Sequence, residues 1–421
     1  MECDVVVVGA GVAGLAAAAT LKEAGKRALV LEASGRIGGR AWTAHPEALG
    51  GAWFDMGAIW FHAAERNPLA AIARKAGETL LRSDDMRQER TFVDGRLAND
   101  AELADYDGAW ARFTAKADEL LASGPPDPPF AAVAEHLPDD AWALTVESWE
   151  GPVICAVDAA DFSLADWRAN PLTGSNLLPD GGIGAFVARR LGAGLDIRLN
   201  APVRRIGWDG RVSVETDAGT VHAERCIVTV STGVLADGVI AFAPKLPEAV
   251  EECLAALPMG LAMKVVLRAE GPDRLDLPRH CLLDRRIETS GEPMMIFQCW
   301  PFGRDYVQGW IGGGAAWALA REGDAAAADF ARAELRRLFG GRVDRLFGAR
   351  AVLVTHWESD PWVRGAYAYA RPGWAAARAR LAEPLAGGRL IFAGEACHEG
   401  LAGTLGGAWE SGEKAARLAM Q

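Results

Sequence analysis

The sequence predicts an α/β protein in which two domains are interwoven along the chain. Residues 5–8 form a continuous valine run, which suits a strand covered on both faces of a parallel sheet, and a helical stretch that ends at Gly25 follows it. Short β segments separated by turn residues fill positions 195 to 230. The chain ends as it begins, with a strand, a glycine turn and a helix from residue 389 onward. A single continuous α/β domain is the alternative organisation.

The first strand runs into a glycine turn with a G-x-G-x-x-G spacing, made by Gly9, Gly11 and Gly14. In this motif the first glycine permits the turn, the second lets backbone amides approach a phosphate, and the third lets helix and strand pack closely. Glu32 ends the next apolar run, where an acidic side chain would bind ribose hydroxyls. The unit therefore predicts a Rossmann-type dinucleotide site, and the motif alone leaves NAD and FAD both open.

The following elements alternate between helix and strand. Residues 67–77 predict a helix with Asn67 as N-cap, Pro68 in the first turn and Gly77 as its stop. A helical, tryptophan-bearing region interrupted by a stiff proline-rich loop at 124–129 comes next. Further elements are expected as a short helix at 181–191, strands at 195–199, 202–208, 211–216, 220–230, 263–268, 293–300 and 305–313, and a long helix at 325–339.

This pattern divides the chain into two discontinuous domains. We expect residues 1–75, 181–240 and 351–421 to form the dinucleotide-binding domain, and residues 76–180 and 241–350 to form a second domain that binds substrate.

Composition narrows the classes of function. The 421 residues are 50% hydrophobic and carry a formal net charge of −12, which argues against a nucleic-acid-binding surface. The seven cysteines are scattered, with no C-x-x-C spacing, so reduced thiols are expected rather than a disulfide framework or a zinc site. No apolar run reaches the roughly 20 residues of a membrane span, and nothing before the first strand resembles a signal peptide. We expect a cytoplasmic protein with no metal, no membrane contact and no nucleic-acid partner.

Two arginines in the segment RIGGR, Arg36 and Arg40, flank glycines that bring backbone amides close together. Guanidinium groups in this arrangement can neutralise the phosphates of a dinucleotide. A surface turn with solvated arginines is the alternative.

Five stretches together resemble the flavin-containing amine oxidase family, which includes monoamine oxidases, polyamine oxidases and lysine-specific histone demethylases. They are LEASGRIGGR, GGAWFDMGAIWFH, LPMGLAMKVVL, THWESDPWVRGAYAYARPG and FAGEACHEGLAGTLGGAWESGEKAA, and they follow the order of the family. The resemblance implies FAD rather than NAD. It also implies a p-hydroxybenzoate-hydroxylase-like fold, with an FAD-binding domain interwoven with a substrate domain of mixed sheet and helices.

The resemblance assigns the residues that would bind the cofactor. Ala366 stands where relatives with covalent flavin carry cysteine, so the FAD is expected to be non-covalent, and the helix that starts at 403–405 is expected to point free amides at the flavin. The expected cofactor-binding residues are Gly9, Gly11, Ala13, Gly14, Glu32, Ala33, Arg36, Gly39, Arg40, Gly57, Ala58, Trp60, Val203, Trp357, Gly394, Glu395, Gly403, Thr404 and Leu405.

The same resemblance implies the catalytic residues. Lys264 matches the lysine that family members bond through a water to flavin N5, although a lysine on the exposed face of a strand would look the same. Trp357 would lie against the flavin, and Tyr367 would form one wall of an aromatic cage in front of it. Thr404 stands where monoamine oxidases carry the second cage tyrosine. The stretch GAIWFH is closer to polyamine oxidases, which makes His62 a candidate for contacting the substrate amine.

The implied reaction oxidises the C–N bond of a primary or secondary amine, either a polyamine or a monoamine. Hydride passes to flavin N5, O₂ is reduced to H₂O₂, the imine is hydrolysed to an aldehyde, and the enzyme is a monomer or homodimer. One alternative is an L-amino-acid oxidase, which would need an arginine such as Arg82, Arg304 or Arg364 to pair with the substrate carboxylate. The others are a flavin dehydrogenase or desaturase and a non-catalytic flavin-binding regulatory protein.

Overall fold

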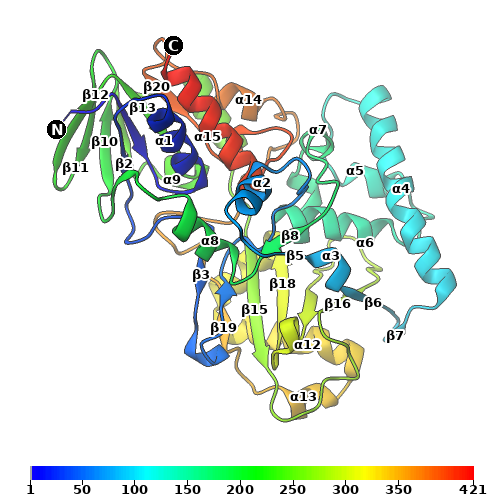
Figure 1. The fold of residues 1–421 in the computed structure, drawn as a ribbon. Coiled ribbons are helices and arrows are strands. Elements are labelled where there is room, and N and C mark those ends of the chain that lie inside the picture. The colour runs from blue at the N-terminus through cyan, green and yellow to red at the C-terminus, as the bar shows by residue number, and fades with distance from the viewer. Residues whose placement is uncertain (1) are drawn as a thin grey trace.

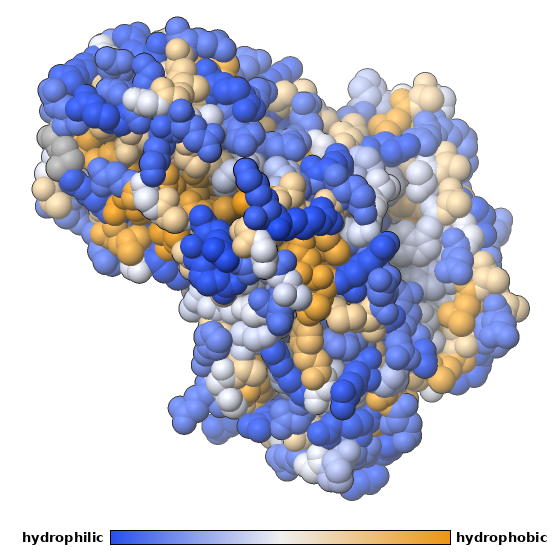
Figure 2. Space-filling view, in the orientation of Figure 1, coloured by the Kyte–Doolittle hydropathy of each residue, from blue (hydrophilic) through white to orange (hydrophobic). Residues whose placement is uncertain are grey.

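The computed structural model describes residues 2–421 and shows two lobes joined at a waist. The termini lie in the upper lobe of Figure 1, and the lower lobe carries the largest sheet, with a group of helices beside it. Figure 2 shows apolar side chains gathered where the lobes meet.

A five-stranded parallel sheet forms the centre of the first lobe, as the valine run predicts. Val5 and Val7 face one buried core while Val6 and Val8 face another, which explains why every residue of the first strand is apolar. In spatial order the strands are β20 (Leu390–Phe392), β13 (Arg225–Val228), β1 (Val5–Val8), β2 (Ala28–Leu31) and β9 (Asp196–Arg198).

Helices cover one face of this sheet and a smaller sheet covers the other. The first face packs against α1 (Val12–Glu23), α2 (Pro68–Lys75), α8 (Ile183–Arg190) and α15 (Leu405–Ala419). The second face packs against β10 (Val203–Gly207), β11 (Val212–Thr216), β12 (Gly219–Ala223), β14 (Ala241–Ala243), α9 (Thr232–Ala236), α10 (Glu248–Ala256) and α14 (Ala377–Leu381). Helix α2 begins as predicted, because the Asn67 side chain accepts a hydrogen bond from Leu69 N.

A seven-stranded mixed sheet forms the second lobe. Its β6 and β16 run parallel, whereas its other neighbouring strands are antiparallel. In spatial order the strands are β19 (Leu353–Val354), β15 (Ala262–Arg268), β18 (Tyr306–Gly312), β17 (Ile296–Cys299), β16 (Cys281–Arg285), β6 (Gln88–Val93) and β7 (Arg96–Leu97). One face is apolar and packs against α11 (Gly313–Glu322), α12 (Asp324–Phe339) and α13 (Arg342–Leu346).

Helices beside the large sheet complete the fold. They are α4 (Asp100–Ser123), α5 (Ala132–Glu135), α6 (Ala143–Ser148), a π-helical stretch (Trp149–Cys155) and α7 (Leu164–Ala169), with a capping box at Asn99 that starts α4. Short pieces connect the parts: β3 (Thr43–Ala44), β4 (Phe54–Asp55), β5 (Leu80–Arg82), α3 (Ser83–Met86), β8 (Leu177–Pro179), and single 3-10 turns at Glu47–Leu49, Ala159–Asp161, Pro301–Gly303 and Glu395–Cys397.

The structure departs from the sequence expectation at three places. Strands β6 and β7 lie inside the region expected to be helical, and β6 joins the large sheet through β16, almost 200 positions away. Strand β14 pairs with β10, and α10 packs on the same core, so residues 241–256 lie with the first lobe. Strand β19 pairs with β15 in the second lobe, beyond the expected boundary at residue 350. Each difference depends on a long-range pairing that local pattern does not encode.

A buried ion pair connects α7, one of the helices beside the large sheet, to α14 in the C-terminal part of the chain. Arg378 on α14 donates from Nε and Nη2 to the two carboxylate oxygens of Asp166 on α7, at 2.6 and 2.8 Å. Arg378 also donates to the carbonyl oxygen of Ala368, and Asp166 accepts from Ala370 N. The segment 366–370 is therefore fixed from both sides.

We expect Asp166→Asn to lower the free energy of unfolding by about 3–5 kcal/mol, because it leaves the buried Arg378 guanidinium without its counter-charge. Denaturant titration followed by tryptophan fluorescence measures the loss. Asp217→Asn, in the exposed pair with Arg204, is the matched control and should change little. Equal effects of the two substitutions would contradict the structural role of the buried pair.

Candidate active site

The glycine turn after β1 forms a cradle for a phosphate. A Cβ on Gly14 would lie 1.9 Å from the carbonyl oxygen of Gly9, so the helix can approach the strand only with glycine there. Helix α1 starts after Gly11 with no side chain capping its first turn. The amides of that turn are thus left to an anion, as the G-x-G-x-x-G spacing predicts.

Glu32 is held at the mouth of the cradle. Its Oε2 accepts a hydrogen bond from Ala10 N at 2.7 Å, and its Oε1 accepts from the backbone N and Oγ of Ser34 at 2.8 and 2.7 Å. The side chain is buried at the carboxyl end of β2. This places a fixed carboxylate where the ribose of a bound dinucleotide would lie.

The RIGGR segment folds onto the same turn. Gly38 N donates to the carbonyl oxygen of Ala10 at 2.8 Å, and a Cβ on Gly39 would lie 3.3 Å from Gly11 Cα. Arg36 donates to the carbonyl oxygen of Gly39, and its guanidinium lies over the Trp42 ring at 4.6 Å. No carboxylate of residues 2–421 forms an ion pair with Arg36, so its charge is available to a phosphate.

Arg40 and Glu395 join the two ends of the chain. Arg40 Nη1 donates to Glu395 Oε1 at 2.8 Å and to the carbonyl oxygen of Ala366 at 2.7 Å. Glu395 accepts in addition from Ala368 N and from Gly403 N, both at 3.1 Å. A pocket of about 310 Å³ lies beside this junction, lined by Arg40, Gly394, Glu395 and residues 228–232. Four of the predicted cofactor-binding residues, including Gly403, therefore lie together here.

Lys264 lies in the interior between the lobes, on strand β15. Its Nζ donates to the carbonyl oxygens of Asp55 and Gly57 at 2.5 and 2.6 Å. Burial lowers the pKa of Lys264 to about 7, and the Asp55 carboxylate opposes that shift. The lysine is not on an exposed strand face, so the structural alternative for Lys264 does not hold.

Asp55 was not among the predicted site residues. Its carboxylate accepts from Thr43 Oγ1 at 2.5 Å and from the backbone N of Ile183 and Gly184 at 3.1 and 3.4 Å, at the start of α8. Burial raises the pKa of this carboxyl. No local pattern could have found it, because its partners come from two distant segments.

Trp357 and Tyr367 lie against two different glycines of the predicted site, Gly57 and Gly403. Trp357 Nε1 donates to the carbonyl oxygen of Met56 at 3.1 Å, and a Cβ on Gly57 would lie 3.0 Å from the Trp357 ring. Tyr367 lies beside Gly403, whose added Cβ would be 3.6 Å from it, and desolvation raises the pKa of Tyr367 to about 12. The phenol is therefore neutral at any physiological pH.

Thr404 caps helix α15. Its hydroxyl accepts from Gly407 N and donates to the carbonyl oxygen of Leu401. The amide of Gly403 donates to Glu395 and that of Thr404 to Leu401. These two amides are therefore not free, which differs from the sequence expectation for this helix start, because the cap and the carboxylate already use the groups of the turn.

His62 is oriented by a chain of polar side chains. Its Nδ1 lies 2.8 Å from Asn176 Oδ1, and Asn176 Nδ2 donates to Asp84 at 3.1 Å. Asn176 thus accepts from His62, which places the proton on Nδ1. Burial lowers the pKa of His62, so the imidazole is neutral near pH 7, with Nε2 as an acceptor. Trp60 lies beside it, with ring centroids 5.7 Å apart.

The remaining predicted residues lie in the first lobe. Val203 starts β10 and is buried in that lobe's core, and the carbonyl of Ala13 faces α15, where a Cβ on Gly412 would lie 2.1 Å away. Ala33, Ala58 and Leu405 adjoin Glu32, Gly57 and Thr404. Leu405 and Ala58 pack against the core around α1.

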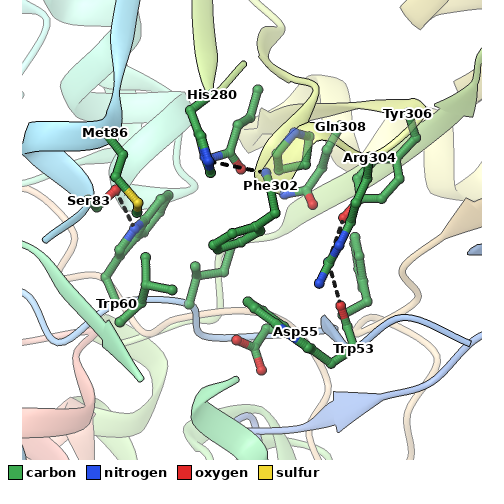
Figure 3. A pocket seen from close by; sticks show the side chains of 15 residues that line it. Trp53, Asp55, Trp60, Ser83, Met86, His280, Phe302, Arg304, Tyr306 and Gln308 are labelled. Carbon is green, nitrogen blue, oxygen red and sulfur yellow. Dashed lines mark hydrogen bonds between the residues drawn. The ribbon is translucent and has the colours of Figure 1, made fainter. Parts of the chain in front are cut away.

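A pocket of about 460 Å³ extends from Trp60 toward the second lobe (Figure 3). Backbone and side chains of residues 53–55 and 59–60 form one wall, and Gln298, Tyr306 and Gln308 of β17 and β18 form another. Of the three arginines considered for a substrate carboxylate, Arg304 lines this pocket. Arg82 pairs instead with Asp85, and Arg364 with Asp237.

Comparison with known proteins identifies the family. The family model described as flavin containing amine oxidoreductase matches residues 12–420. The chain belongs to this family. The predictions of an amine oxidoreductase and of its fold are thereby confirmed.

Individual relatives agree with that assignment. The amine oxidoreductase is 29% identical to probable polyamine oxidase 4 of Arabidopsis thaliana, over 99% of this chain and 87% of the relative, and 28% identical to polyamine oxidase 4 of Oryza sativa, over 98% and 88%. It also matches a solved structure of putrescine oxidase bound to putrescine, with a TM-score of 0.79 and 22% identity over 99% of this chain and 98% of the other.

The described residues 2–421 contain no group of three or more histidine, cysteine or acidic side chains placed to hold a metal ion. Within the same part of the chain, no helix is both long and apolar enough to cross a membrane. The seven cysteines are all free.

Lys264 should make folding stability depend on pH. Between about 7, the pKa in the folded protein, and 10.5, the usual lysine value, the unfolded chain holds a proton that the folded protein lacks, so stability rises with pH across this range. Relative to the parent, Lys264→Met should therefore be most stable near pH 7 and lose that advantage toward pH 10. Denaturant titrations of both proteins at equal flavin loading measure the difference, and a pH-independent difference would contradict the assignment.

Proposed function

We propose that this amine oxidoreductase binds FAD non-covalently and oxidises a primary or secondary amine with O₂ as the electron acceptor. The observation that carries the proposal is the convergence of Lys264, Gly57, Trp357 and Tyr367 next to the Arg40–Glu395 junction. FAD, when bound, supplies the acceptor for hydride from the carbon next to the amine nitrogen and passes the electrons on to O₂.

The phosphate cradle supports a dinucleotide flavin rather than a mononucleotide. The uncapped start of α1 and the unpaired Arg36 would hold the pyrophosphate, and Glu32 would hold a ribose. Ala366 supports non-covalent binding, because its methyl group has no nucleophile and its carbonyl oxygen is used by Arg40.

The interior groups support oxidation of a neutral amine. Tyr367 and His62 are both uncharged near pH 7, and His62 Nε2 can accept a hydrogen bond from the amine. Neither of these two side chains brings a negative charge that would stabilise the protonated amine, so the neutral amine, the form that can lose hydride, is favoured. Burial keeps water away from the reacting carbon.

Lys264 supports reaction with oxygen. With a pKa of about 7, it carries a positive charge in part of the molecules at neutral pH, and its three donors can bind one group beyond the two carbonyl oxygens that they already contact. A cation held in a water-poor site stabilises negative charge that builds on oxygen.

Anaerobic mixing with amines tests the function. Relatives carry the names polyamine oxidase and putrescine oxidase, so aliphatic diamines and polyamines head the panel, followed by arylalkylamines and L-amino acids. We expect an amine to bleach the flavin absorbance, and admission of O₂ to restore it with formation of H₂O₂.

In Lys264→Met the bleaching should persist while recovery slows about 10- to 100-fold, because a positive charge beside the oxygen is lost. If the flavin absorbance of Lys264→Met recovered at the parent's rate, Lys264 would have no role in the reaction with O₂. If no amine bleached the parent enzyme, the proposed amine oxidation would be contradicted.

Release of the cofactor tests the binding mode. Acid precipitation should leave all the yellow colour in the supernatant, with the mass of FAD. Glu32→Gln should weaken FAD binding about 10- to 100-fold, equivalent to about 1.5–3 kcal/mol for a hydrogen bond to a charged group. Equilibrium dialysis measures this loss, and the exposed Glu215→Gln on β11 is the control. Flavin that remains with the precipitate would contradict non-covalent binding.

A further inference from the structure

The pocket in Figure 3 carries donors that the amine chemistry does not use. Gln308 and Arg304 enter it from the second lobe, while Trp60 and Ser83 lie opposite, bonded to each other at 3.0 Å. Trp60 packs on Trp310, with ring centroids 5.4 Å apart, and Trp310 pairs with Lys264 across the two strands. Arg304 lies just before Tyr306, which pairs with Arg268, four positions farther along β15. The pocket thus has a near end at the reaction site and a far end at Arg304.

Arg304 brings a positive charge without a counter-charge. Its guanidinium lies over the Trp53 and Phe302 rings, at 4.6 and 5.1 Å, and donates to the carbonyl oxygen of Trp53 at 2.7 Å. In the described chain no carboxylate forms an ion pair with Arg304 or with Arg279, which lies against Gly303. Most arginines here do pair with acids, in a protein whose net charge is −12. The far end of the pocket is therefore locally cationic.

Gln308 presents a second, independent donor to the same space. The residue is 4% exposed, and its Nε2 is buried with no hydrogen-bond partner. A buried amide donor without a partner costs free energy, so Gln308 Nε2 needs an acceptor that the described residues do not supply.

The one acid that lines the pocket does not supply this acceptor. The Asp55 carboxylate is bound by Thr43 and by the first amides of α8, and in Figure 3 it points away from Arg304. The pKa of His280, which also lines the pocket, is lowered first by burial and then by the guanidinium groups of Arg279 and Arg304. The imidazole is therefore neutral near pH 7, and Arg304 is the cation among the described lining residues.

The backbone around the far end is strained, which indicates that this arrangement is maintained at a cost. His280, Trp300 and Phe302 have φ angles of 57°, 54° and 56°, a region that bulky residues rarely adopt. His280 Nε2 accepts from Phe302 N at 3.2 Å, and this bond holds the two strained residues together. The strain positions Phe302 and Arg304 against Trp53.

We propose that this pocket binds a carboxylate group, held by the Arg304 guanidinium and the Gln308 amide. The carboxylate has two possible sources. It is the far end of the amine substrate, an ω-amino carboxylate whose amine lies toward Gly57, or it belongs to a separate small carboxylate. The first source rests on the proposed function, and the second does not. A second ammonium group, as in a diamine, is disfavoured at this end by Arg304.

Three probes that share a four-carbon chain separate these sources: 4-aminobutanoate, 1,4-diaminobutane and butanoate. Isothermal titration of the flavin-loaded enzyme measures binding, and anaerobic bleaching measures oxidation. Binding of 4-aminobutanoate with bleaching assigns the carboxylate to the substrate, whereas binding of butanoate without bleaching by 4-aminobutanoate assigns it to a separate ligand. If neither carboxylate binds, the proposal is overturned, even if the diamine bleaches the flavin and so supports the amine-oxidase function.

Variants tie the binding to the named groups. Arg304→Met and Gln308→Met should each weaken carboxylate binding at least 10-fold, whereas Arg268→Met, an exposed arginine on β15 paired with Asp305, should leave it unchanged. Gln308→Met should also raise the unfolding temperature of the ligand-free enzyme, because it removes the unpaired amide. A higher unfolding temperature would show that the weaker binding by Gln308→Met comes from the loss of a ligand contact and not from damage to the fold. Carboxylate binding that survives both pocket substitutions would overturn the assignment.

Discussion

The Arg40–Glu395 ion pair is the contact on which the arrangement of the site depends. One guanidinium and one carboxylate, largely removed from water, bind the glycine-rich segment near the N-terminus, the strap at 366–368 and the turn before α15. A buried charge pair of this kind is stabilising only while all its hydrogen bonds are made, because losing one partner leaves an unpaired charge in the interior. The pair therefore ties the segment 366–368 and Gly403 to the glycine-rich segment that carries Arg40.

A second set of contacts fixes the lobes to each other at Lys264. Among the described residues no carboxylate lies within bonding distance of Lys264 Nζ, and two main-chain carbonyl oxygens accept its hydrogen bonds instead. Those carbonyls belong to residues 55 and 57, and the side chain of Asp55 is in turn bound by Thr43 and the start of α8. The same surroundings thus set both the position and the pKa of Lys264. Burial lowers this pKa, and the Asp55 carboxylate raises it in part.

Local chemistry explains which features could be predicted from the sequence. Gly14 and Asn67 act through neighbours within a few positions, so spacing reveals the turn and the cap. The family motifs predicted Lys264, Trp357 and Tyr367 as site residues, and in the structure Lys264 and Trp357 contact the segment 56–57 while Tyr367 lies beside Gly403. Strand β6 and Asp55 could not be found in this way, because the strand that pairs with β6 and the α8 amides that bind Asp55 lie more than 100 positions away. Gln308 shows the same limit, since nothing in its own strand marks its amide as unpaired.

The two faces of the seven-stranded sheet have different roles, because one packs in the apolar core and the other lines the space between the lobes. Along β18, Val307 and Ile311 face the apolar core under α12, whereas Tyr306, Gln308 and Trp310 face the space between the lobes. Because successive side chains of a strand point to opposite faces, substitutions at alternate positions change the lining of the pocket and leave the core intact. Lys264 occupies the same face on β15, opposite Trp310. One sheet face thus carries both Lys264, which we propose for the reaction with oxygen, and Gln308, which we propose as a carboxylate donor, on neighbouring strands of one scaffold.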